Sequence, residues 1–286
     1  MNQRNYLEST LESVFSQAYP RLEYIVVDGG STDGSVDIIR NHAHRLKWWV
    51  SEPDAGQTDA LIKGFARASG HLLNWLNSDD LLRPGALFGV ARAYMESGAD
   101  LIAGGDRQFT GDPEQPVSHF QPAGYRFPDC LRFWAGGFRY HQPCTFFSRD
   151  AYSRVGGLDR CLHYTMDYDL YCRILRDART GVHYLDQELS AFRLHDGAKT
   201  SRAKAGFIEE LREVSQRYWP ADWGDAERRA MDRYSAECSL FQGAEAVRKN
   251  QWRGGVQAIG RALGYAPFHA ATYAARRIFG KAGLQQ

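Results

Sequence analysis

Several features that define other classes of protein are missing from this chain. Only five of the 286 residues are cysteine, and no two of them form the Cys-x-x-Cys pair that zinc and redox sites use. The first five residues, MNQRN, do not resemble a signal peptide, and no run of about 18 apolar residues could span a bilayer. We therefore expect a cytoplasmic protein whose contact with a membrane is peripheral.

Acidic residues are missing from the end of the chain. Between Ala246 and Gln286 there are seven Lys and Arg residues and no Asp or Glu. The net charge of the whole chain is +1, so the residues before Ala246 hold 28 basic against 34 acidic side chains and carry −6. This contrast predicts two regions of different charge. A basic segment with interspersed apolar residues, among them Trp252, Ile278 and Phe279, is typical of a helix that lies at an anionic membrane surface, and also of one that packs its apolar face on an acidic domain, which is the interpretation that we favour.

The glycine motifs of two common nucleotide-binding classes are also missing. The chain contains neither G-x-G-x-x-G nor G-x-x-x-x-G-K-[ST]. The first motif would bring a dinucleotide close to a helix N-terminus, and the second would cradle the phosphates of a nucleoside triphosphate. Their absence argues against a dehydrogenase and against a P-loop enzyme.

The patterns that are present alternate between helical and extended segments. The extended runs are 22–28, 46–50, 71–76 and 100–104, and the helical patterns are 7–15, 36–41, 54–68 and 85–97. This alternation predicts parallel βαβ units, which bind ligands beyond the carboxyl ends of their strands. Asp28 and Asp79 follow two such ends. No apolar run precedes Tyr6, although such a sheet normally opens with a buried strand, so we expect its first strand to be missing.

The second half of the chain is less regular. Residues 107–140 are rich in proline and aromatic side chains, which predicts a lid or an acceptor-facing insertion. Extended runs follow at 144–148, 181–185 and 189–194, with helical patterns at 149–155 and 167–177, and the pattern is helical beyond residue 201. We predict an α/β catalytic domain over residues 1–200 and a basic helical region over 201–286.

Two aspartates suggest chemistry at the strand ends. Asp79 and Asp80 offer carboxylates of the kind that Mg²⁺ prefers together with substrate phosphates, and Mn²⁺ suits the same ligands. Such a metal would stabilise the charge on a departing nucleotide diphosphate. The pair alone is equally consistent with a helix cap or a turn.

Asp28 ends a strand and is followed by glycines. Gly29, Gly30 and Gly34 allow the backbone to take a positive φ or to approach a ligand closely, and the Asp28 carboxylate could accept hydrogen bonds from a nucleobase. The same sequence is common in turns that end strands, and by itself it favours that interpretation.

Taken together, the motifs resemble those of family 2 glycosyltransferases of the GT-A fold. They are residues 24–35 (YIVVDGGSTDGS), 51–57 (SEPDAGQ) and 75–80 (WLNSDD), followed by 141–143 (HQP), 155–159 (VGGLD), 166–170 (MDYDL) and 193–195 (RLH). The resemblance runs to about Ser201. It implies an inverting, metal-dependent transferase of the hexosyltransferase type, of the kind that builds bacterial polysaccharides, with Mg²⁺ or Mn²⁺ as its cofactor.

The resemblance also implies roles for particular residues. Those that would bind the nucleotide donor are Asp28, Gly30, Ser31, Asp54, Gln57, Asn77, Ser78 and Arg193. Those that would hold the metal are Asp79, Asp80 and His195, and Asp167 would be the catalytic base. Asn77 stands where many relatives carry the first Asp of a D-x-D motif. Candidates for contact with the donor sugar or the acceptor are His141, Gln142, Trp134 and Asp169.

Asp167 also makes chemical sense without the resemblance. A sugar hydroxyl is a poor nucleophile and needs a positioned proton acceptor, and one carboxylate suffices for inversion. Asp169 could be that base instead, or both residues could simply begin a helix, where negative charge is favourable. Trp134, Phe138 and Tyr140 could stack on a sugar ring.

Two other functions remain open from the sequence. One is a binding protein that has lost catalysis together with its first strand, and the other is a nucleotidyltransferase, which also uses metal-binding carboxylates. We expect the partners to be a nucleotide-diphospho-sugar donor and a glycan or lipid-linked acceptor, and we expect no nucleic acid. Neither the donor sugar nor the acceptor can be deduced from the fold class alone.

Overall fold

The computed structural model describes residues 1–199 and 204–279, and these form two compact units. The first unit contains Met1–Cys130 and Phe138–Asp196, and the second contains Leu131–Gly137 and Gly197–Gln286.

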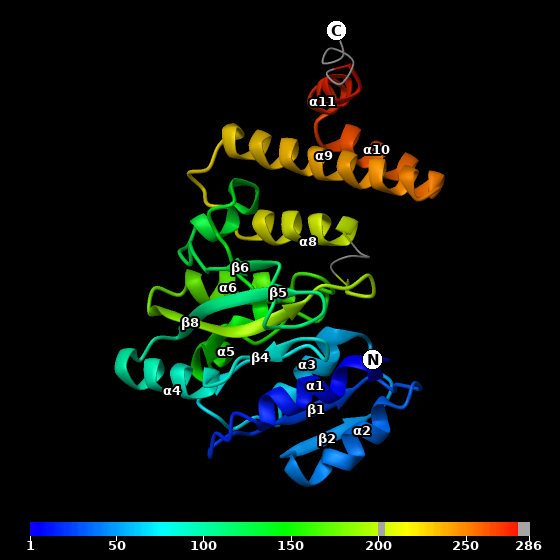
Figure 1. Cartoon of the computed structure of the whole chain (residues 1–286). Coiled ribbons are helices and arrows are strands. Elements are labelled where there is room, and N and C mark those ends of the chain that lie inside the picture. The colour runs from blue at the N-terminus through cyan, green and yellow to red at the C-terminus, as the bar shows by residue number, and fades with distance from the viewer. Residues whose placement is uncertain (200–203, 280–286) are drawn as a thin grey trace. The chain divides into compact units, whose positions relative to one another are not determined.

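The first unit begins with a small αβ layer. Helix α1 (Arg4–Phe15) is followed by β1 (Ile25–Asp28), α2 (Ser35–His42), a 3₁₀ turn (Ala43–Arg45), β2 (Trp48–Ser51) and α3 (Gln57–Phe65). Strands β1 and β2 pair in parallel as a sheet of their own, next to α1 and α2 (Figure 1). A core of Leu7, Leu11 and Ile39 joins the two helices to this sheet, because Leu7 and Leu11 are four residues apart on one face of α1 and meet Ile39 of α2.

A larger mixed sheet contains the other strands of the first unit. The remaining elements in chain order are β3 (Leu72–Leu73), β4 (Leu81–Leu82), α4 (Ala86–Ser97), β5 (Leu101–Phe109), β6 (Ser118–Phe120), β7 (Thr145–Ser148), α5 (Arg149–Arg154), α6 (Met166–Arg176) and β8 (Val182–Arg193). Their order in the sheet is β3-β7-β5-β8-β4, and β6 pairs with β5. Its buried core includes Ile102, Phe146 and Leu189.

The sheet is less parallel than the alternation of elements predicts. The pairs β1–β2 and β5–β8 are parallel, whereas β3–β7, β4–β8, β5–β6 and β5–β7 are antiparallel. Parallel neighbouring strands require a crossover connection, usually a helix. Strand β6 lies within the irregular segment and β7 follows it, so both can join the sheet in the antiparallel direction. The prediction of a mostly parallel sheet was therefore wrong for these strands.

The strands of the first unit form two separate sheets. Among the described residues, no strand pairs with the second edge of β1 or of β3. The β-branched residues Ile25, Val26 and Val27 are only partly buried, although such a run is typical of a central strand. The expected strand 71–76 is reduced to two residues, because Asn74 Nδ2 donates to the Thr145 carbonyl at 2.8 Å and Gln142 Nε2 donates to the Trp75 carbonyl in place of ladder bonds.

Some boundaries differ from those that the sequence predicts. The runs 181–185 and 189–194 form one strand, β8, which follows β5 with register shifts around Gly104 and Gly105. A bulge absorbs the polar residues between the two runs, so the strand continues through them. The helix predicted at 85–97 is confirmed as α4.

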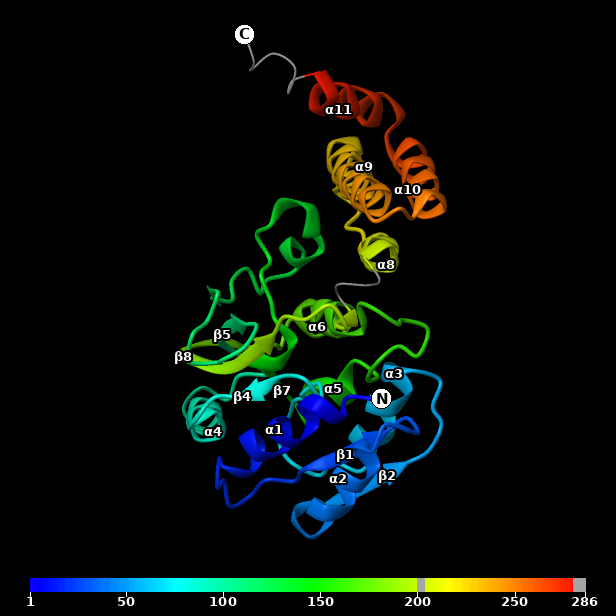
Figure 2. The same ribbon diagram turned by 45° about the vertical axis from the view of Figure 1, so that its right-hand side comes forward.

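The second unit is helical. It comprises α8 (Lys204–Arg217), α9 (Asp225–Arg248), α10 (Trp252–Tyr265) and α11 (Pro267–Phe279), with a 3₁₀ turn at Phe133–Ala135. Helices α9 and α10 lie side by side (Figure 2) and approach closely because small residues face each other: a Cβ on Gly255 would lie 2.7 Å from Val247 Cγ2. Leu131–Gly137 is tied to α8 by the Ser215 hydroxyl, which donates to the Leu131 carbonyl at 2.8 Å.

Candidate active site

A hydrogen-bonded loop follows β1. The Asp28 carboxylate is 6% exposed and accepts hydrogen bonds from the Ser31 amide at 2.8 Å, the Ser31 hydroxyl at 2.5 Å and the Ser51 hydroxyl at 2.7 Å. Burial opposes ionisation, but the hydrogen bonds from Ser31 and Ser51 outweigh it and lower the pKa of Asp28. Gly30 has a φ of +82° and donates its amide to the same carboxylate. Asp28 is therefore an anion that shapes the loop.

A second loop lies directly against the first. The Asp54 carboxylate accepts the Gly56 amide at 2.9 Å, and a Cβ on Gly29 would lie 2.5 Å from Asp54 Oδ2. A side chain at position 29 would therefore displace the Asp54 carboxylate. Gln57, at the start of α3, donates from Nε2 to Asn77 Oδ1 at 2.8 Å. Adjacent loops therefore link six of the residues that are predicted to bind the nucleotide donor: Asp28, Gly30, Ser31, Asp54, Gln57 and Asn77.

Asp79 and His195 meet across the fold. Their Oδ2 and Nε2 atoms are 2.9 Å apart, and each side chain is about one-seventh exposed, with values of 15% and 14%. The neighbouring Arg193 donates from Nε to the Asp79 carbonyl at 3.0 Å, and its guanidinium lies over the rings of Tyr6 and Phe109. The end of β8 is thereby held against the turn that follows β3.

Asp80 has a different environment from Asp79. It is 1% exposed, and its two oxygens accept the Arg193 amide at 3.0 Å and Asn77 Nδ2 at 3.2 Å. Burial raises the pKa of the Asp80 carboxyl well above its usual range, and the charges of Asp79 and Asp106 add to the effect. The turn itself is fixed by the Thr10 hydroxyl, which donates to the carbonyls of Ser78 and Asp80. Asp79 is the more accessible carboxylate of the pair.

The two aspartates at the start of α6 also differ. Asp169 is fully buried and pairs with Arg173, whose Nε and Nη2 lie 2.8 and 2.6 Å from Asp169 Oδ2. Asp167 is partly exposed and accepts the Tyr168 amide at 2.8 Å. Its charge raises the pKa of the nearby Tyr140 hydroxyl, although burial is the larger cause. Asp169 is committed to a buried ion pair, whereas Asp167 can be reached by solvent.

His141 and Gln142 begin the turn before β7. His141 Nδ1 lies 2.8 Å from Asp106 Oδ2, and Gln142 Oε1 is buried without a hydrogen-bond partner among the described residues. The sequence did not single out Asp106. It lies on β5 with a fully buried side chain, and a lone aspartate inside an apolar strand was the signal that could have found it.

The remaining aromatic candidates occupy two different units. Trp134 belongs to the second unit, where it stacks with Trp219 at a centroid distance of 6.0 Å. Phe138 and Tyr140 belong to the first unit and stack on each other at 5.0 Å. Phe138 is 8% exposed, which makes it a core residue rather than an open platform.

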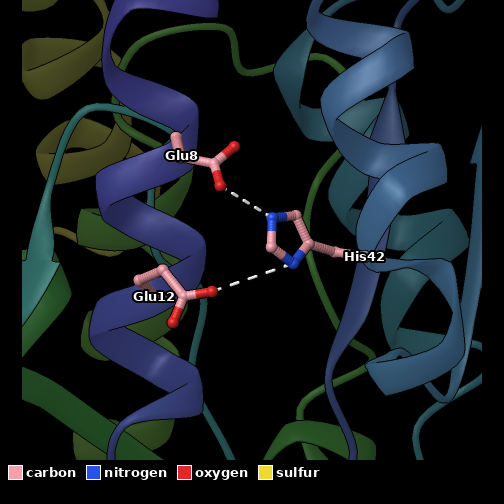
Figure 3. A group of neighbouring side chains, drawn as sticks. All are labelled: Glu8, Glu12 and His42. Atoms are coloured by element: carbon pink, nitrogen blue, oxygen red, sulfur yellow. Dashed lines mark hydrogen bonds and ion pairs between the residues drawn. The ribbon is translucent and has the colours of Figure 1, made fainter.

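A separate cluster on α1 and α2 contains Glu8, Glu12 and His42 (Figure 3). His42 Nε2 lies 2.8 Å from Glu8, and Nδ1 lies 3.8 Å from Glu12. The two carboxylates face different nitrogens of one ring, and each contact joins α1 to α2. The cluster therefore links α1 to α2 and lies on other elements than the residues predicted to bind the donor.

The fold and these loops define the class of protein. The structure resembles that of Staphylococcus aureus TarS residues 1–349 in complex with UDP-GlcNAc, with a TM-score of 0.63 at 16% identity, covering 93% of this chain and 79% of TarS 1–349. The chain has the GT-A fold of nucleotide-sugar transferases. The sequence profile of glycosyl transferase family 2 matches residues 1–156, and the chain belongs to this family.

Relatives of known sequence agree with this family. An uncharacterized glycosyltransferase of Mycobacterium tuberculosis is 32% identical over 171 residues, covering 55% of this chain and 59% of the relative. An uncharacterized glycosyltransferase of Rickettsia typhi is 27% identical, covering 71% of this chain and 64% of the relative. TuaG of Bacillus subtilis, named for teichuronic acid biosynthesis, is 38% identical over 82 residues, covering 28% of this chain and 32% of TuaG. The chain spans about three fifths of the length of the first two relatives.

Proposed function

We propose that this chain transfers a sugar from a nucleotide diphosphate donor to an acceptor hydroxyl with inversion at the anomeric carbon. The observation that carries the proposal is the 2.9 Å contact between Asp79 and His195, residues that are 116 positions apart. It joins the turn after β3 to the end of β8, on the strand-end side where α/β folds bind their ligands. Asp28, Gly30 and Ser31 would bind the base, and Arg193 would face the diphosphate.

The side chains at this turn fit a hard divalent cation. Asp79 offers a carboxylate oxygen and His195 an imidazole nitrogen, and substrate phosphates would supply the other ligands. When bound, Mg²⁺ or Mn²⁺ would neutralise the charge that develops on the departing diphosphate. Asp80 would hold the turn by its hydrogen bonds to Arg193 and Asn77, instead of binding the metal directly.

Asp167 would act as the base that accepts the proton of the acceptor hydroxyl. Its partial exposure supports this role, as does the commitment of Asp169 to Arg173. His141 and Gln142 would contact the sugar or the acceptor, and the unpartnered Gln142 Oε1 supports such a contact.

A donor screen tests this proposal. We expect UDP-, dTDP- or GDP-sugars to raise the melting temperature in the presence of Mn²⁺, because a ligand bound only by the native state stabilises it. The donor that binds should then be consumed with release of the nucleoside diphosphate when an acceptor is present. Release of pyrophosphate from a nucleoside triphosphate would instead indicate a nucleotidyltransferase, and donor binding without any turnover would indicate a binding protein.

We further propose that the transferred sugar is a hexose and that its acceptor is a glycan or a lipid-linked acceptor of a cell-surface polysaccharide, reached at the inner face of the membrane. No helix in the described part of the chain is long and apolar enough to cross a bilayer. Helix α10 supports a peripheral contact, because Gly255, Ala258 and Ala262 are buried whereas larger apolar residues are exposed. The exposed set recurs every three or four residues and comprises Trp252, Val256, Ile259 and Leu263.

The charge of this segment favours an anionic lipid surface. Residues 246–286 carry seven cations and no anion, and each cation near such a surface contributes about 1 kcal/mol. Lys281 and the side chains of Arg276 and Arg277 lie outside the described residues. Ile278 and Phe279 are the last two residues of α11, and their side chains also lie outside the part of the chain that the structure describes.

Liposome co-sedimentation tests the membrane contact. We expect salt-sensitive binding to anionic vesicles that is weakened by Val256→Ser with Ile259→Ser and retained by Gln257→Ser, which alters an exposed polar position of the same helix. Absence of binding at low salt would contradict the membrane contact and leave the transferase proposal intact.

A further inference from the structure

A buried carboxylate lies beneath His141. Asp106 is 0% exposed, and its Oδ2 atom is 2.8 Å from His141 Nδ1. Its Oδ1 atom accepts the Ser190 hydroxyl at 2.5 Å. Asp106 and Ser190 are direct neighbours on the parallel strands β5 and β8. Both oxygens of the carboxylate therefore have partners, and one of them is the imidazole.

The His141 ring is also held from its face. Phe120 stacks on it with a centroid distance of 3.8 Å and an interplanar angle of 4°, and Phe192 lies 5.8 Å away. The side chain is 24% exposed. Because Nδ1 is directed at the buried carboxylate, Nε2 is the ring nitrogen left for a ligand. No described residue forms a hydrogen bond with Nε2.

His141 lies near the proposed diphosphate site. Phe192, which contacts its ring, precedes Arg193, whose amide binds Asp80. Asp106 lies opposite Ser190 in the register of β5 and β8, and Ser190 lies opposite Leu82, two residues after Asp80. The Asp106–His141 pair is thus adjacent to the residues proposed to bind the donor.

We propose that Asp106 is a positioning residue that fixes His141 in the tautomer with hydrogen on Nδ1, so that Nε2 accepts a hydrogen bond from a sugar hydroxyl. An ionised carboxylate has no hydrogen to donate, so Nδ1 must be the donor in this contact. In the neutral ring the other nitrogen is then an acceptor. The proposal rests on the proposed transferase function for the identity of the hydroxyl, but not for the tautomer.

The tautomer can be measured in the wild-type protein. The chain contains nine histidines, and ¹⁵N labelling of their rings with two-bond ¹H–¹⁵N spectra distinguishes the two tautomers from the charged ring. The His141→Gln variant assigns the signal. We expect a protonated Nδ1 and an unprotonated Nε2 at pH 8. A ring protonated on Nε2, or on both nitrogens, would overturn the proposal even if every variant folded poorly.

A double-mutant cycle tests how Asp106 acts. Asp106→Leu removes both acceptor oxygens, and His141→Gln removes the imidazole. We expect each to lower the transfer rate roughly 10- to 100-fold, the size expected when a buried polar partner is lost. In the His141→Gln background, Asp106→Leu should cause no further loss, because Asp106 acts only through the ring. Additive losses would mean that Asp106 has an independent role and would contradict the proposal.

Ser190→Ala is the matched control. It removes the other hydrogen bond to Asp106 and leaves the contact with His141 in place. We expect this variant to keep the tautomer and most of the transfer rate, even if its melting temperature falls. Equal losses of transfer rate in Ser190→Ala and Asp106→Leu would show that the Asp106 carboxylate has only a structural role and would contradict the proposal. If the wild type transfers no sugar from any donor, the proposed function fails, while the spectra still decide the tautomer.

Discussion

Two aspartates on the first turn of α6 should respond to substitution in opposite ways. Asp169→Asn breaks the ion pair between the fully buried Asp169 and Arg173, which is 16% exposed and is also held by the Val155 carbonyl at 2.7 Å. Removing one member of such a pair costs about 3–5 kcal/mol because the other charge stays buried. For a unit of this size that corresponds to a fall in melting temperature of about 6–20 °C.

Asp167→Asn should change the rate instead. Asn can still accept the Tyr168 amide, so we expect the melting temperature to fall by less than about 3 °C. Loss of a general base lowers turnover by roughly 10²–10⁴-fold, with donor affinity nearly unchanged because the base acts on the acceptor. Thermal unfolding followed by circular dichroism, steady-state turnover and donor titration give the three quantities needed.

A double variant provides the control for Asp169. Asp169→Leu with Arg173→Met removes both charges, and replacing a buried ion pair by apolar residues is often neutral for stability. The double variant should therefore recover most of the stability that Asp169→Asn loses. If Asp169→Asn abolished turnover at an unchanged melting temperature, while Asp167→Asn remained active, the base would be Asp169 and our reasoning from burial would be refuted.

Three other predictions concern the donor loops. Asp79→Asn should abolish activation by Mn²⁺. Asp80→Asn should retain it, because Asp80 is buried and both of its carboxylate oxygens are hydrogen-bonded within the protein. Equal losses of activation by the two variants in Mn²⁺ titrations would contradict this prediction. Gly29→Ala should weaken donor binding in calorimetry, since its Cβ would lie 2.5 Å from Asp54 Oδ2, and unchanged affinity would count against the contact between the loops. Because the pKa of Asp28 is lower in the folded than in the unfolded state, its ionised carboxylate stabilises the fold at pH values above the unfolded-state pKa. This contribution is lost as the pH falls through the folded-state pKa. The difference in unfolding free energy between the wild type and Asp28→Asn should therefore shrink in acid titrations below about pH 4.

The sequence predicted the parts of the fold that depend on local patterns. The alternation of apolar runs and helical spacing located β1, β2, α4 and β5, and the motifs located the turns that carry Asp28 and Asp79. These features can be predicted because residues close in sequence determine them.

The remaining features depend on contacts between distant residues. Asn74 and Gln142 end β3 early by bonding backbone carbonyls across the sheet, which no periodicity reveals. Asp79 and Asp80 look equivalent in sequence, and only the Arg193 amide, 113 positions away, shows that Asp80 is held inside. The pairing of Asp106 with His141 is likewise fixed by the register of β5, β8 and the turn before β7.

The proposed transfer inverts the configuration at the anomeric carbon of the sugar, and the anomeric configuration of the product tests this proposal most directly. The measurement is the one-bond or three-bond coupling of the new anomeric proton, recorded by NMR on the purified product of the donor and acceptor found by screening. A single in-line displacement with Asp167 as base predicts an anomeric configuration opposite to that of the donor. A product with the same configuration as the donor would contradict it.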